Sequence, residues 1–220
     1  MARMPRVVVP YFPHHVTQRG NRRQKTFFGV DDYLYYIELL AEFSKLAETE
    51  IWAYCLMPNH VHLVMFPSHE DGLRAALGEA HRRYTRHINF RQGWRGHLWQ
   101  ERFHSFLMDE KYLLATVRYV EMNPVAAGLC KKAWDWQFSS ARAHLEGKDD
   151  RLVRVSPMLK RVGNWRDYLS STAKDNTAEQ IRKHTRTGRP LGTAEFVNQI
   201  EFLSGETLVP RRPGPKPKPS

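Results

Sequence analysis

The alternation of apolar and polar residues in the first half of the chain predicts several short β-strands. Runs rich in β-branched, aromatic and other apolar residues have the length and period of strands. These runs are His14–Gly20, Ile51–Met57, His60–Phe66 and Phe103–Met108. Only the turn pair Pro58-Asn59 separates the second run from the third, so we expect these two strands to form an antiparallel hairpin.

Apolar residues near helical spacing predict three longer helices between and after the strands. We expect them from Asp31 or Asp32 to about Thr49, from Gly72 to about Phe90, and from Lys111 to Met122. The pair Asn123-Pro124 should break or redirect the third helix, because proline lacks an amide hydrogen and restricts the residue before it. The order strand, helix, strand, strand, helix, strand, helix predicts an α+β fold in which helices cover one antiparallel sheet.

The composition changes near Glu146, and the pattern beyond this point is weaker. Trp165 and Tyr168 indicate a short packed helix, and Ala194–Leu203 can form another that docks on the main domain. The last ten residues, RRPGPKPKPS, should be extended and mobile because they are rich in proline and positive charge. We therefore expect a main domain at 1–145, a helical extension at 146–180 and a basic, partly disordered tail at 181–220.

The chain of 220 residues is basic, with 34 Lys and Arg residues against 23 Asp and Glu residues and a formal net charge of +11. Such a charge favours polyanionic partners: nucleic acid, an acidic membrane or an anionic substrate. The two cysteines, Cys55 and Cys130, have neither metal-binding nor redox-active spacing, which suits a cytoplasmic protein. The sequence has no apolar leader and no apolar run of about 20 residues, so membrane residence is not expected.

The segment MPNHVHLV contains the most informative pair of residues, His60 and His62. They are two positions apart on a predicted strand, so both imidazoles leave the same face and can share a divalent cation. Two histidines do not complete a metal site, and ordinary half-buried histidines fit this spacing equally well. The other histidines of the main domain are expected to be satisfied polar residues or phosphate contacts. They are His14, His15, His81, His87, His97 and His104.

Tyr119 and Asn123 are four residues apart in the third predicted helix, so they share one face. A tyrosine oxygen and an amide oxygen placed in this way can approach the same metal-bound phosphate, and tyrosine is a workable nucleophile toward phosphorus beside a cation. Two alternatives stay open: Tyr119 as a core aromatic residue, and Asn123 as the N-cap of a helix that begins with Pro124. Glu121 lies on another face of the helix and is a weaker ligand candidate.

Four motifs occur in the chain in a fixed order: HVTQRGNRRQ, MPNHVHLV, LWQERFHS and RYVEMNPVAAGL. Together they resemble the REP-associated tyrosine transposases, which are relatives of the single-tyrosine HUH transposases of IS200-like elements. The resemblance covers roughly Pro10 to Leu145. It implies a ferredoxin-like sheet with helices packed on it, the HUH nuclease fold, followed in this chain by a C-terminal extension.

The resemblance also implies the chemistry of the main domain. Residues 1–145 would be the catalytic domain, with His60, His62 and Asn123 as ligands of Mg²⁺ or Mn²⁺ and Tyr119 as the nucleophile. The expected activity is cleavage and rejoining of single-stranded DNA through a 5′-phosphotyrosine, with a REP-type hairpin as substrate. Alternatives are a non-catalytic sequence-specific DNA-binding protein derived from a transposase, and a metal-dependent phosphohydrolase of small substrates.

Basic residues in several parts of the chain are candidates for contacts with DNA phosphates. They are Arg19, Arg22, Arg23, Lys25, Arg82, Arg83, Arg86, Arg102 and Arg189. Gly188-Arg189-Pro190 resembles the core of an AT-hook, in which an extended arginine enters the minor groove, although a solubilising end of the chain has the same composition. The expected partner is single-stranded or hairpin DNA, the expected location is the cytoplasm in association with the nucleoid, and the expected state is a monomer, with a dimer as the alternative.

Overall fold

A four-stranded antiparallel sheet forms the centre of the protein, in the computed structural model that describes residues 6–171 and 176–209. The strand order is β2-β3-β1-β4. The strands are β1 (His14–Arg19), β2 (Thr49–Met57), β3 (His60–Pro67) and β4 (His104–Leu107). Their bounds match the four predicted runs to within two residues at each end, and β2 and β3 form the expected hairpin.

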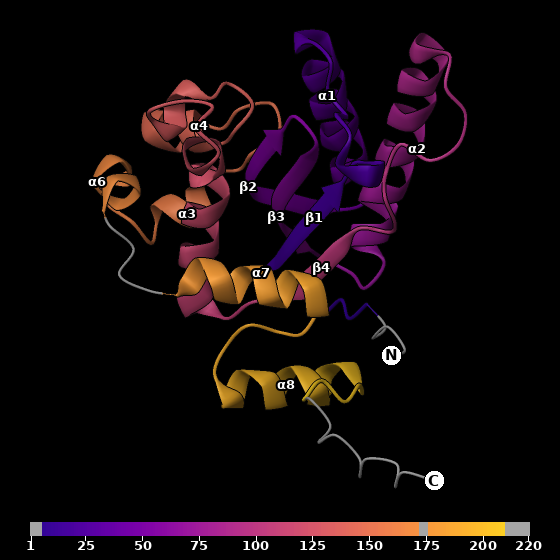
Figure 1. The fold of residues 1–220 in the computed structure, drawn as a ribbon. Helices are drawn as coiled ribbons and strands as arrows, with labels where there is room; N and C mark the ends of the chain where they lie inside the picture. Colours follow the sequence, from indigo (N-terminus) through magenta and orange to yellow (C-terminus); the bar gives the residue numbers. More distant parts are fainter. Residues whose placement is uncertain (1–5, 172–175, 210–220) are drawn as a thin grey trace, which may run out of the picture.

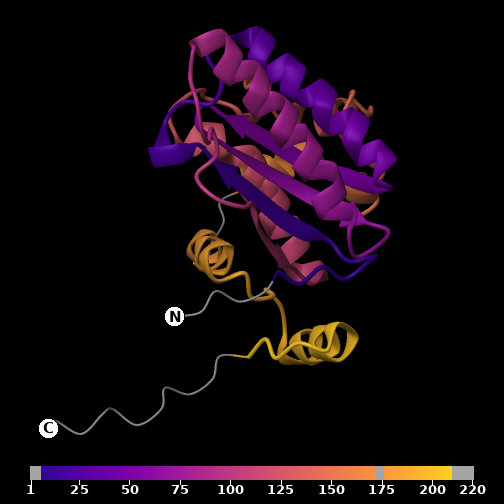
Figure 2. The same cartoon turned by 90° about the vertical axis from the view of Figure 1, so that its right-hand side faces the viewer.

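Helices cover both faces of this sheet (Figures 1 and 2). The two helices α1 (Val30–Leu46) and α2 (Gly72–Gln92) lie side by side on one face, and α3 (Glu110–Ala126) lies on the other. Apart from the 3₁₀ turn Asn21–Arg23 after β1, the elements from β1 to β4 follow the order β-α-β-β-α-β, which is that of a ferredoxin-like fold. The prediction of an α+β fold with a ferredoxin-like sheet is confirmed.

The period of the side chains along β3 explains why two separate cores form. Val61 and Leu63 point toward α1 and α2, whereas Val64 packs in the second core, on the α3 face. Alternate residues of a strand face opposite sides of a sheet, so the two histidines that alternate with Val61 and Leu63 must face α3. The helix α2 buries Leu73, Ala76, Leu77, Ala80, Tyr84 and Ile88 at helical spacing against the first core.

The helix α3 does not end at Met122, and this part of the prediction is wrong. It continues to Ala126 with Pro124 inside it. Pro124 removes a single helical hydrogen bond near the C-terminal end, where little helix remains to be broken, and the Ala127 amide still donates to the Asn123 carbonyl at 2.9 Å. Asn123 is therefore not the N-cap of a new helix; its side-chain Nδ2 donates to the Tyr119 carbonyl at 2.8 Å.

Beyond α3, the rest of the chain adds further short helices. They are the 3₁₀ turn Ala133–Asp135, α4 (Ala141–Glu146), α5 (Ser156–Leu159), α6 (Trp165–Ser170), α7 (Thr177–Thr187) and α8 (Ala194–Ser204). Trp165 is buried in the second core, so the predicted packed helix is present as α6. Within residues 6–171 and 176–209, no helix is both long and apolar enough to cross a membrane.

Residues 177–209 are packed on the sheet domain, and the predicted boundary at 181 falls inside α7. Ile181 of α7 is buried in the second core, and Leu191 exchanges backbone hydrogen bonds with Leu107 and Asp109 at the end of β4. Phe196 and Ile200 of α8 form a third apolar cluster with Leu107. A separate basic tail is thus not present up to Val209, and the RRPGPKPKPS ending lies outside the described residues.

Candidate active site

His60 and His62 lie on the α3 face of the sheet, where the strand period places them. The two ring centroids are 4.9 Å apart and the rings are nearly perpendicular. On the neighbouring strand β1, Arg19 pairs with His60 and Thr17 pairs with His62. The expected projection of both imidazoles from one face is therefore present, with Arg19 as the nearest cationic neighbour along the sheet.

The hydrogen bonds of these histidines leave one nitrogen of each ring available. His60 Nδ1 lies 2.6 Å from Asn59 Oδ1, and His62 Nδ1 lies 3.0 Å from His15 Nε2. Neither Nε2 atom has a hydrogen-bond partner among the described residues. Neither is fully buried, so both atoms are open to solvent. Two adjacent imidazoles with free Nε2 atoms fit a divalent cation as ligands.

Both imidazoles are held in the neutral form, which is the form that binds metals. Burial, together with the positive charge of Arg19, lowers the pKa of His60 to about 4. Burial also lowers the pKa of His62 well below its usual value, with smaller effects from His60, His15 and Arg19. At neutral pH, protons therefore do not compete with a cation for these two rings.

The described acids, histidines and cysteines do not add a third ligand to the histidine pair. Across the described ranges, no group of three or more His, Cys, Asp and Glu side chains is arranged to hold a metal ion. Asn123 uses its Nδ2 to bond the Tyr119 carbonyl, which leaves its Oδ1 as the atom able to face a cation. This is compatible with the expected ligand role of Asn123, and it excludes the cap role.

Tyr119 of α3 lies against the histidine pair. Its ring centroid is 5.6 Å from that of His62, with the two rings perpendicular, and 6.3 Å from that of His15. The side chain is half-buried and packs on the second core. The ring of Tyr119 is thus part of the core wall and also lies against the histidine pair, so the position is compatible with both roles that the sequence left open.

His15 is a site residue that sequence analysis missed. It is fully buried, and its ring lies parallel to that of His62 with a centroid distance of 5.2 Å. The signal in the sequence was its position, because His15, Thr17 and Arg19 alternate along β1 and share one face. What the sequence could not supply was the register of β1 against β3, which brings His15 diagonally opposite His62.

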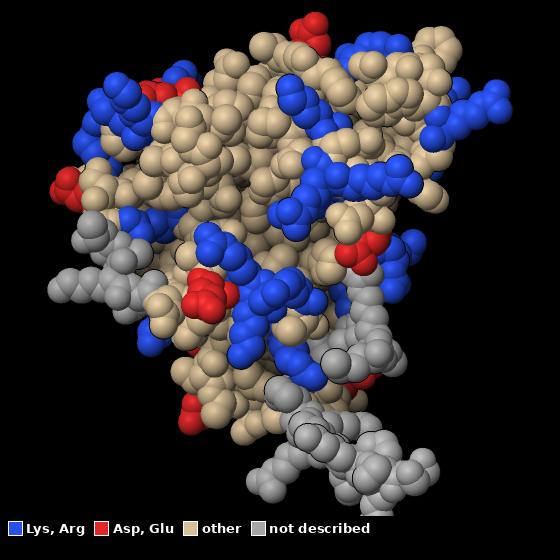
Figure 3. All heavy atoms as spheres, in the orientation of Figure 1, with Lys and Arg blue, Asp and Glu red and all other residues tan. Residues whose placement is uncertain are grey.

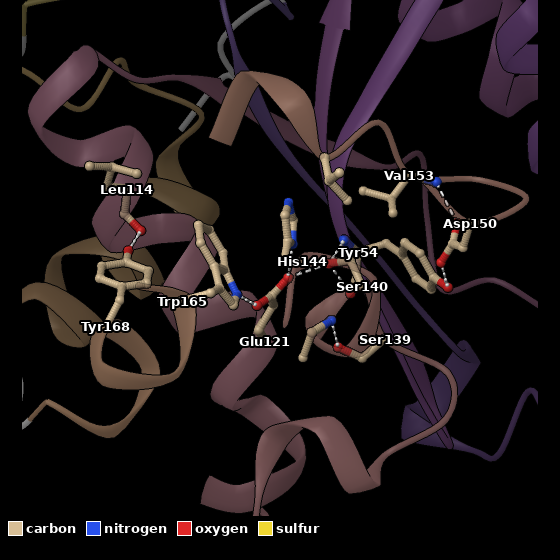
Figure 4. Close-up of polar contacts among 12 residues, drawn as sticks. Tyr54, Leu114, Glu121, Ser139, Ser140, His144, Asp150, Val153, Trp165 and Tyr168 are labelled. Carbon is tan, nitrogen blue, oxygen red and sulfur yellow. Dashed lines mark hydrogen bonds and ion pairs between the residues drawn. The ribbon is translucent and has the colours of Figure 1, made fainter. Parts of the chain in front are cut away.

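Glu121 is not part of the histidine cluster. It lies on a different face of α3, as expected, and its side chain is fully buried among hydrogen-bond donors (Figure 4). Ser140 Oγ donates to it at 2.5 Å, His144 Nδ1 at 2.6 Å and Trp165 Nε1 at 2.9 Å. This carboxylate therefore anchors α3 to the segments that follow it, and it is not free to serve as a ligand.

Three of the four sequence motifs meet at the end of β1, next to His60. The Gly20 amide donates to the Asn59 carbonyl and the Gln100 amide to the Arg19 carbonyl, at 2.8 and 2.9 Å. A side chain at Gly20 would meet the Gln24 carbonyl oxygen at 2.3 Å, so only glycine fits this crossing. The exposed basic residues Arg19, Arg22, Arg23, Lys25 and Arg102 lie on these segments.

The basic residues of α2 lie away from the histidines, because α2 covers the opposite face of the sheet. Arg82 and Arg83 both bond Glu79, and Arg83 also lies 3.6 Å from Glu42. Arg86 is exposed on the same helix. The structure therefore does not bring Arg82, Arg83 and Arg86 together with His60 and Tyr119.

Arg189 is not in an extended AT-hook. Gly188 is the left-handed residue that ends α7, with φ of 71°, and Pro190 is buried just after it; this glycine–proline spacing is typical of a helix C-terminus. His184 Nδ1 lies 2.8 Å from the Arg189 carbonyl oxygen, and the Arg189 guanidinium donates to the Leu208 carbonyl. The same three residues therefore terminate a helix, and Arg189 holds the end of the described chain in place.

Comparison with known proteins agrees with this geometry. A Haemophilus influenzae protein named as a REP-associated tyrosine transposase is 31% identical over 102 residues, which are 41% of this chain and 58% of the relative's length. A solved REP-associated tyrosine transposase bound to a REP hairpin has the same fold, with a TM-score of 0.57 and 22% identity over 70% of this chain and 92% of that one.

The IS200-like transposase family matches residues 9–123, which are more than half of the chain and include both histidines and Tyr119. The family resemblance expected from the four sequence motifs is confirmed: the chain belongs to the IS200-like transposase family.

Proposed function

We propose that the protein cleaves and rejoins single-stranded DNA, with Tyr119 as the nucleophile. The observation that carries this proposal is the contact between Tyr119 and His62, whose ring centroids are 5.6 Å apart, beside two histidines with free Nε2 atoms. A nucleophile next to a cation site is the arrangement that phosphoryl transfer requires. A hydrolase of small substrates has no need of the basic loops that surround this site.

In the proposed reaction, the Tyr119 oxygen attacks the scissile phosphorus while the bond from phosphorus to the 3′-oxygen breaks. The phenol proton leaves to solvent and the departing 3′-oxygen takes up a proton from solvent, so the products are a 5′-phosphotyrosine and a free 3′-hydroxyl. A second 3′-hydroxyl can reverse the step and join a new strand without ATP, because the phosphodiester energy is conserved. When bound at His60, His62 and Asn123, Mg²⁺ or Mn²⁺ would polarise a non-bridging phosphate oxygen and offset the phenolate charge.

The expected substrate is single-stranded or hairpin DNA of the REP type. Arg19, Arg22, Arg23, Lys25 and Arg102 are exposed on the segments that meet beside His60, which suits phosphate contacts along a strand. Lysine and arginine side chains also gather in the middle of the face shown in Figure 3, where acidic side chains are few. With such a substrate, the protein would work at the nucleoid.

The proposed unit is a monomer. His60, His62 and Tyr119 come from one chain, and α3 is fixed to its own sheet and to the C-terminal helices. A second copy is not needed to bring the nucleophile to the histidines. This supports a monomer as the catalytic unit, with a dimer as the alternative.

The main alternative is a DNA-binding protein that has lost the reaction, and a single assay separates the two functions. The protein is incubated with Mn²⁺ and a labelled hairpin strand, and the products are separated by gel electrophoresis in SDS. Cleavage together with an SDS-resistant protein–DNA adduct supports the proposal, with Tyr119→Phe as the control that forms neither. Binding of the hairpin without cleavage or adduct supports the alternative, and cleavage without adduct supports a hydrolase.

A further inference from the structure

Each of the two histidines in the active site has one dedicated partner behind it. Asn59 Oδ1 lies 2.6 Å from His60 Nδ1, and His15 Nε2 lies 3.0 Å from His62 Nδ1. We propose that Asn59 and His15 are positioning residues, which accept the Nδ1 hydrogens of His60 and His62 and so keep both Nε2 lone pairs directed to one cation. This inference rests on the proposed function, because it needs a metal at the histidine pair.

The orientation of Asn59 makes the hydrogen bond to His60 one-directional. Asn59 Nδ2 donates to the Arg23 carbonyl at 3.0 Å, which places its Oδ1 toward His60. An amide oxygen only accepts hydrogen bonds, so His60 Nδ1 must carry a hydrogen. A neutral imidazole has one N–H, and the other nitrogen of His60, Nε2, is therefore the lone-pair donor.

The bond between His15 and His62 can run in two directions, and only one of them allows metal binding. If His15 Nε2 donates, the single hydrogen of neutral His62 sits on Nε2, which then has no lone pair for a cation. If His62 Nδ1 donates to His15 Nε2, the lone pair of His62 Nε2 is free. A cation at His62 therefore requires His15 as the acceptor.

The environment of His15 points to a role in this hydrogen bond and not in packing alone. Its ring is fully buried and makes an edge-to-face contact with Phe106 at 5.0 Å, yet its Nδ1 has no partner among the described residues. Such an atom lowers the stability of the fold, and an apolar side chain would avoid this cost. The gain that offsets this cost is the contact with His62, because partners of this kind fix the ring and the tautomer of a metal ligand.

The neighbouring residue provides a matched control. His14 is also fully buried on β1, but it faces the opposite side of the sheet. Its Nδ1 lies 2.8 Å from the Phe12 carbonyl oxygen, and its Nε2 accepts from the Val9 amide at 3.4 Å. Replacing His14 therefore disturbs the same strand to a similar extent without touching His62.

The test measures the affinity for Mn²⁺ alone, by electron paramagnetic resonance, together with the thermal unfolding midpoint. We expect His15→Leu and Asn59→Ala to weaken Mn²⁺ binding by about 10- to 100-fold, the usual effect of removing such a partner. His15→Gln should recover most of the affinity, because its amide oxygen can accept from His62 Nδ1. His14→Leu should lower the unfolding midpoint and leave Mn²⁺ affinity unchanged.

A second measurement needs no substitution and decides the matter if His15→Leu does not fold. In the ¹⁵N-histidine-labelled wild-type protein with Mg²⁺, a coupling across the hydrogen bond should link the two nitrogens, with the hydrogen attached to His62 Nδ1. A hydrogen attached to His15 Nε2, or unchanged Mn²⁺ affinity in both His15→Leu and Asn59→Ala, overturns the inference. A wild-type protein without Mn²⁺ affinity contradicts instead the metal site of the proposed function.

Discussion

The carboxylate of Glu121 and the imidazole of His144 form a 2.6 Å hydrogen bond between two fully buried side chains (Figure 4). Glu121 lies two residues after Tyr119 on α3, and Ser140 and Trp165 donate to the same carboxylate. The helix that carries the tyrosine is thus held from behind by residues far along the chain. We expect this network to fix the rotation of α3 and, with it, the direction in which Tyr119 points.

We expect Glu121→Gln to loosen this anchor. The amide has one acceptor oxygen where the carboxylate has two, so at least one of the three buried donors loses its partner, at a cost of about 1–3 kcal/mol in the free energy of unfolding. Urea unfolding measures this loss. Adduct formation should slow more than Mn²⁺ affinity falls, because the proposed ligands His60 and His62 are on a strand and only Asn123 lies on α3.

The control for this prediction is Glu110→Gln at the start of the same helix. Glu110 is exposed and pairs with Arg161, so its replacement should change stability by less than about 1 kcal/mol. A Glu121→Gln protein as stable and as active as this control would show that the network does not hold α3.

We expect Tyr119→Phe to abolish cleavage and the covalent adduct while DNA affinity stays nearly intact. The substitution removes one oxygen and keeps the ring that packs against His62. An adduct gel and a hairpin-binding titration measure the two effects. Tyr112→Phe, near the other end of α3, serves as the matched variant and should keep full activity; cleavage by the Tyr119→Phe protein would contradict the assignment of the nucleophile.

We expect His60→Ala and His62→Ala each to remove Mn²⁺-dependent cleavage and to weaken Mn²⁺ binding in a calorimetric titration. Their effects on stability should differ. His62 is 6% exposed and bonds His15, so His62→Ala leaves His15 Nε2 without a partner and should cost about 1–3 kcal/mol. His60 is less buried, and its replacement should cost less. Unchanged Mn²⁺ affinity in both variants would contradict the metal site.

The sheet and the histidine pair could be predicted because both depend on short-range periodicity. Strand positions two apart share a face, so the run from His60 to Val64 already separates imidazoles from core residues. The helix that carries Tyr119 was also foreseen, but not its end, because the prediction treated Pro124 as a break. A proline near the last turn removes one hydrogen bond, and local packing compensates for it.

The remaining features depend on pairings between distant parts of the chain. The bond from His15 to His62 needs the register of β1 on β3, and the bond from Glu121 to His144 spans 23 residues. No pattern within one segment encodes either contact. The Gly188-Arg189-Pro190 segment does have a local pattern, but the pattern is ambiguous, because the same three residues suit both a DNA contact and a helix end. Only the packing of α7 distinguishes the two.

We expect the protein to lose stability in mild acid, partly through His81. This side chain bonds the Tyr36 hydroxyl at 2.9 Å, and burial lowers its pKa to about 3. Between pH 6.5 and 3, the unfolded chain therefore binds a proton that the folded protein does not, so the free energy of unfolding falls as the pH falls through this range. At pH 5.5 this one histidine should account for about 1.4 kcal/mol relative to pH 7.5.

Urea unfolding of the wild type and of His81→Gln at these two pH values tests this prediction. The difference between the two pH values should be smaller in the variant by about that amount. An equal pH dependence in the two proteins would mean that His81 is charged in the folded state or that its environment opens before unfolding.

Four basic residues follow Val209 in the sequence: Arg211, Arg212, Lys216 and Lys218. A truncation before Arg189 would not test them cleanly, because Leu191, Phe196 and Leu208 pack on the end of the sheet domain. Ending the chain at Val209 leaves this packing in place. If the four charges contact the hairpin stem, their removal should weaken hairpin binding and flatten its salt dependence. Each lost phosphate contact lowers the log–log slope by about 0.7–0.9, so the largest change is about 3 to 4.

A full-length variant with these four residues changed to Gln separates charge from chain length, and it should behave like the truncated protein. Cleavage of a short unstructured strand should survive in both, because His60, His62 and Tyr119 are untouched. If both proteins bind the hairpin with the wild-type affinity and salt slope, the contacts to DNA must come from the sheet domain. The basic loops beside His60, from Arg19 to Lys25, are then the first residues to substitute.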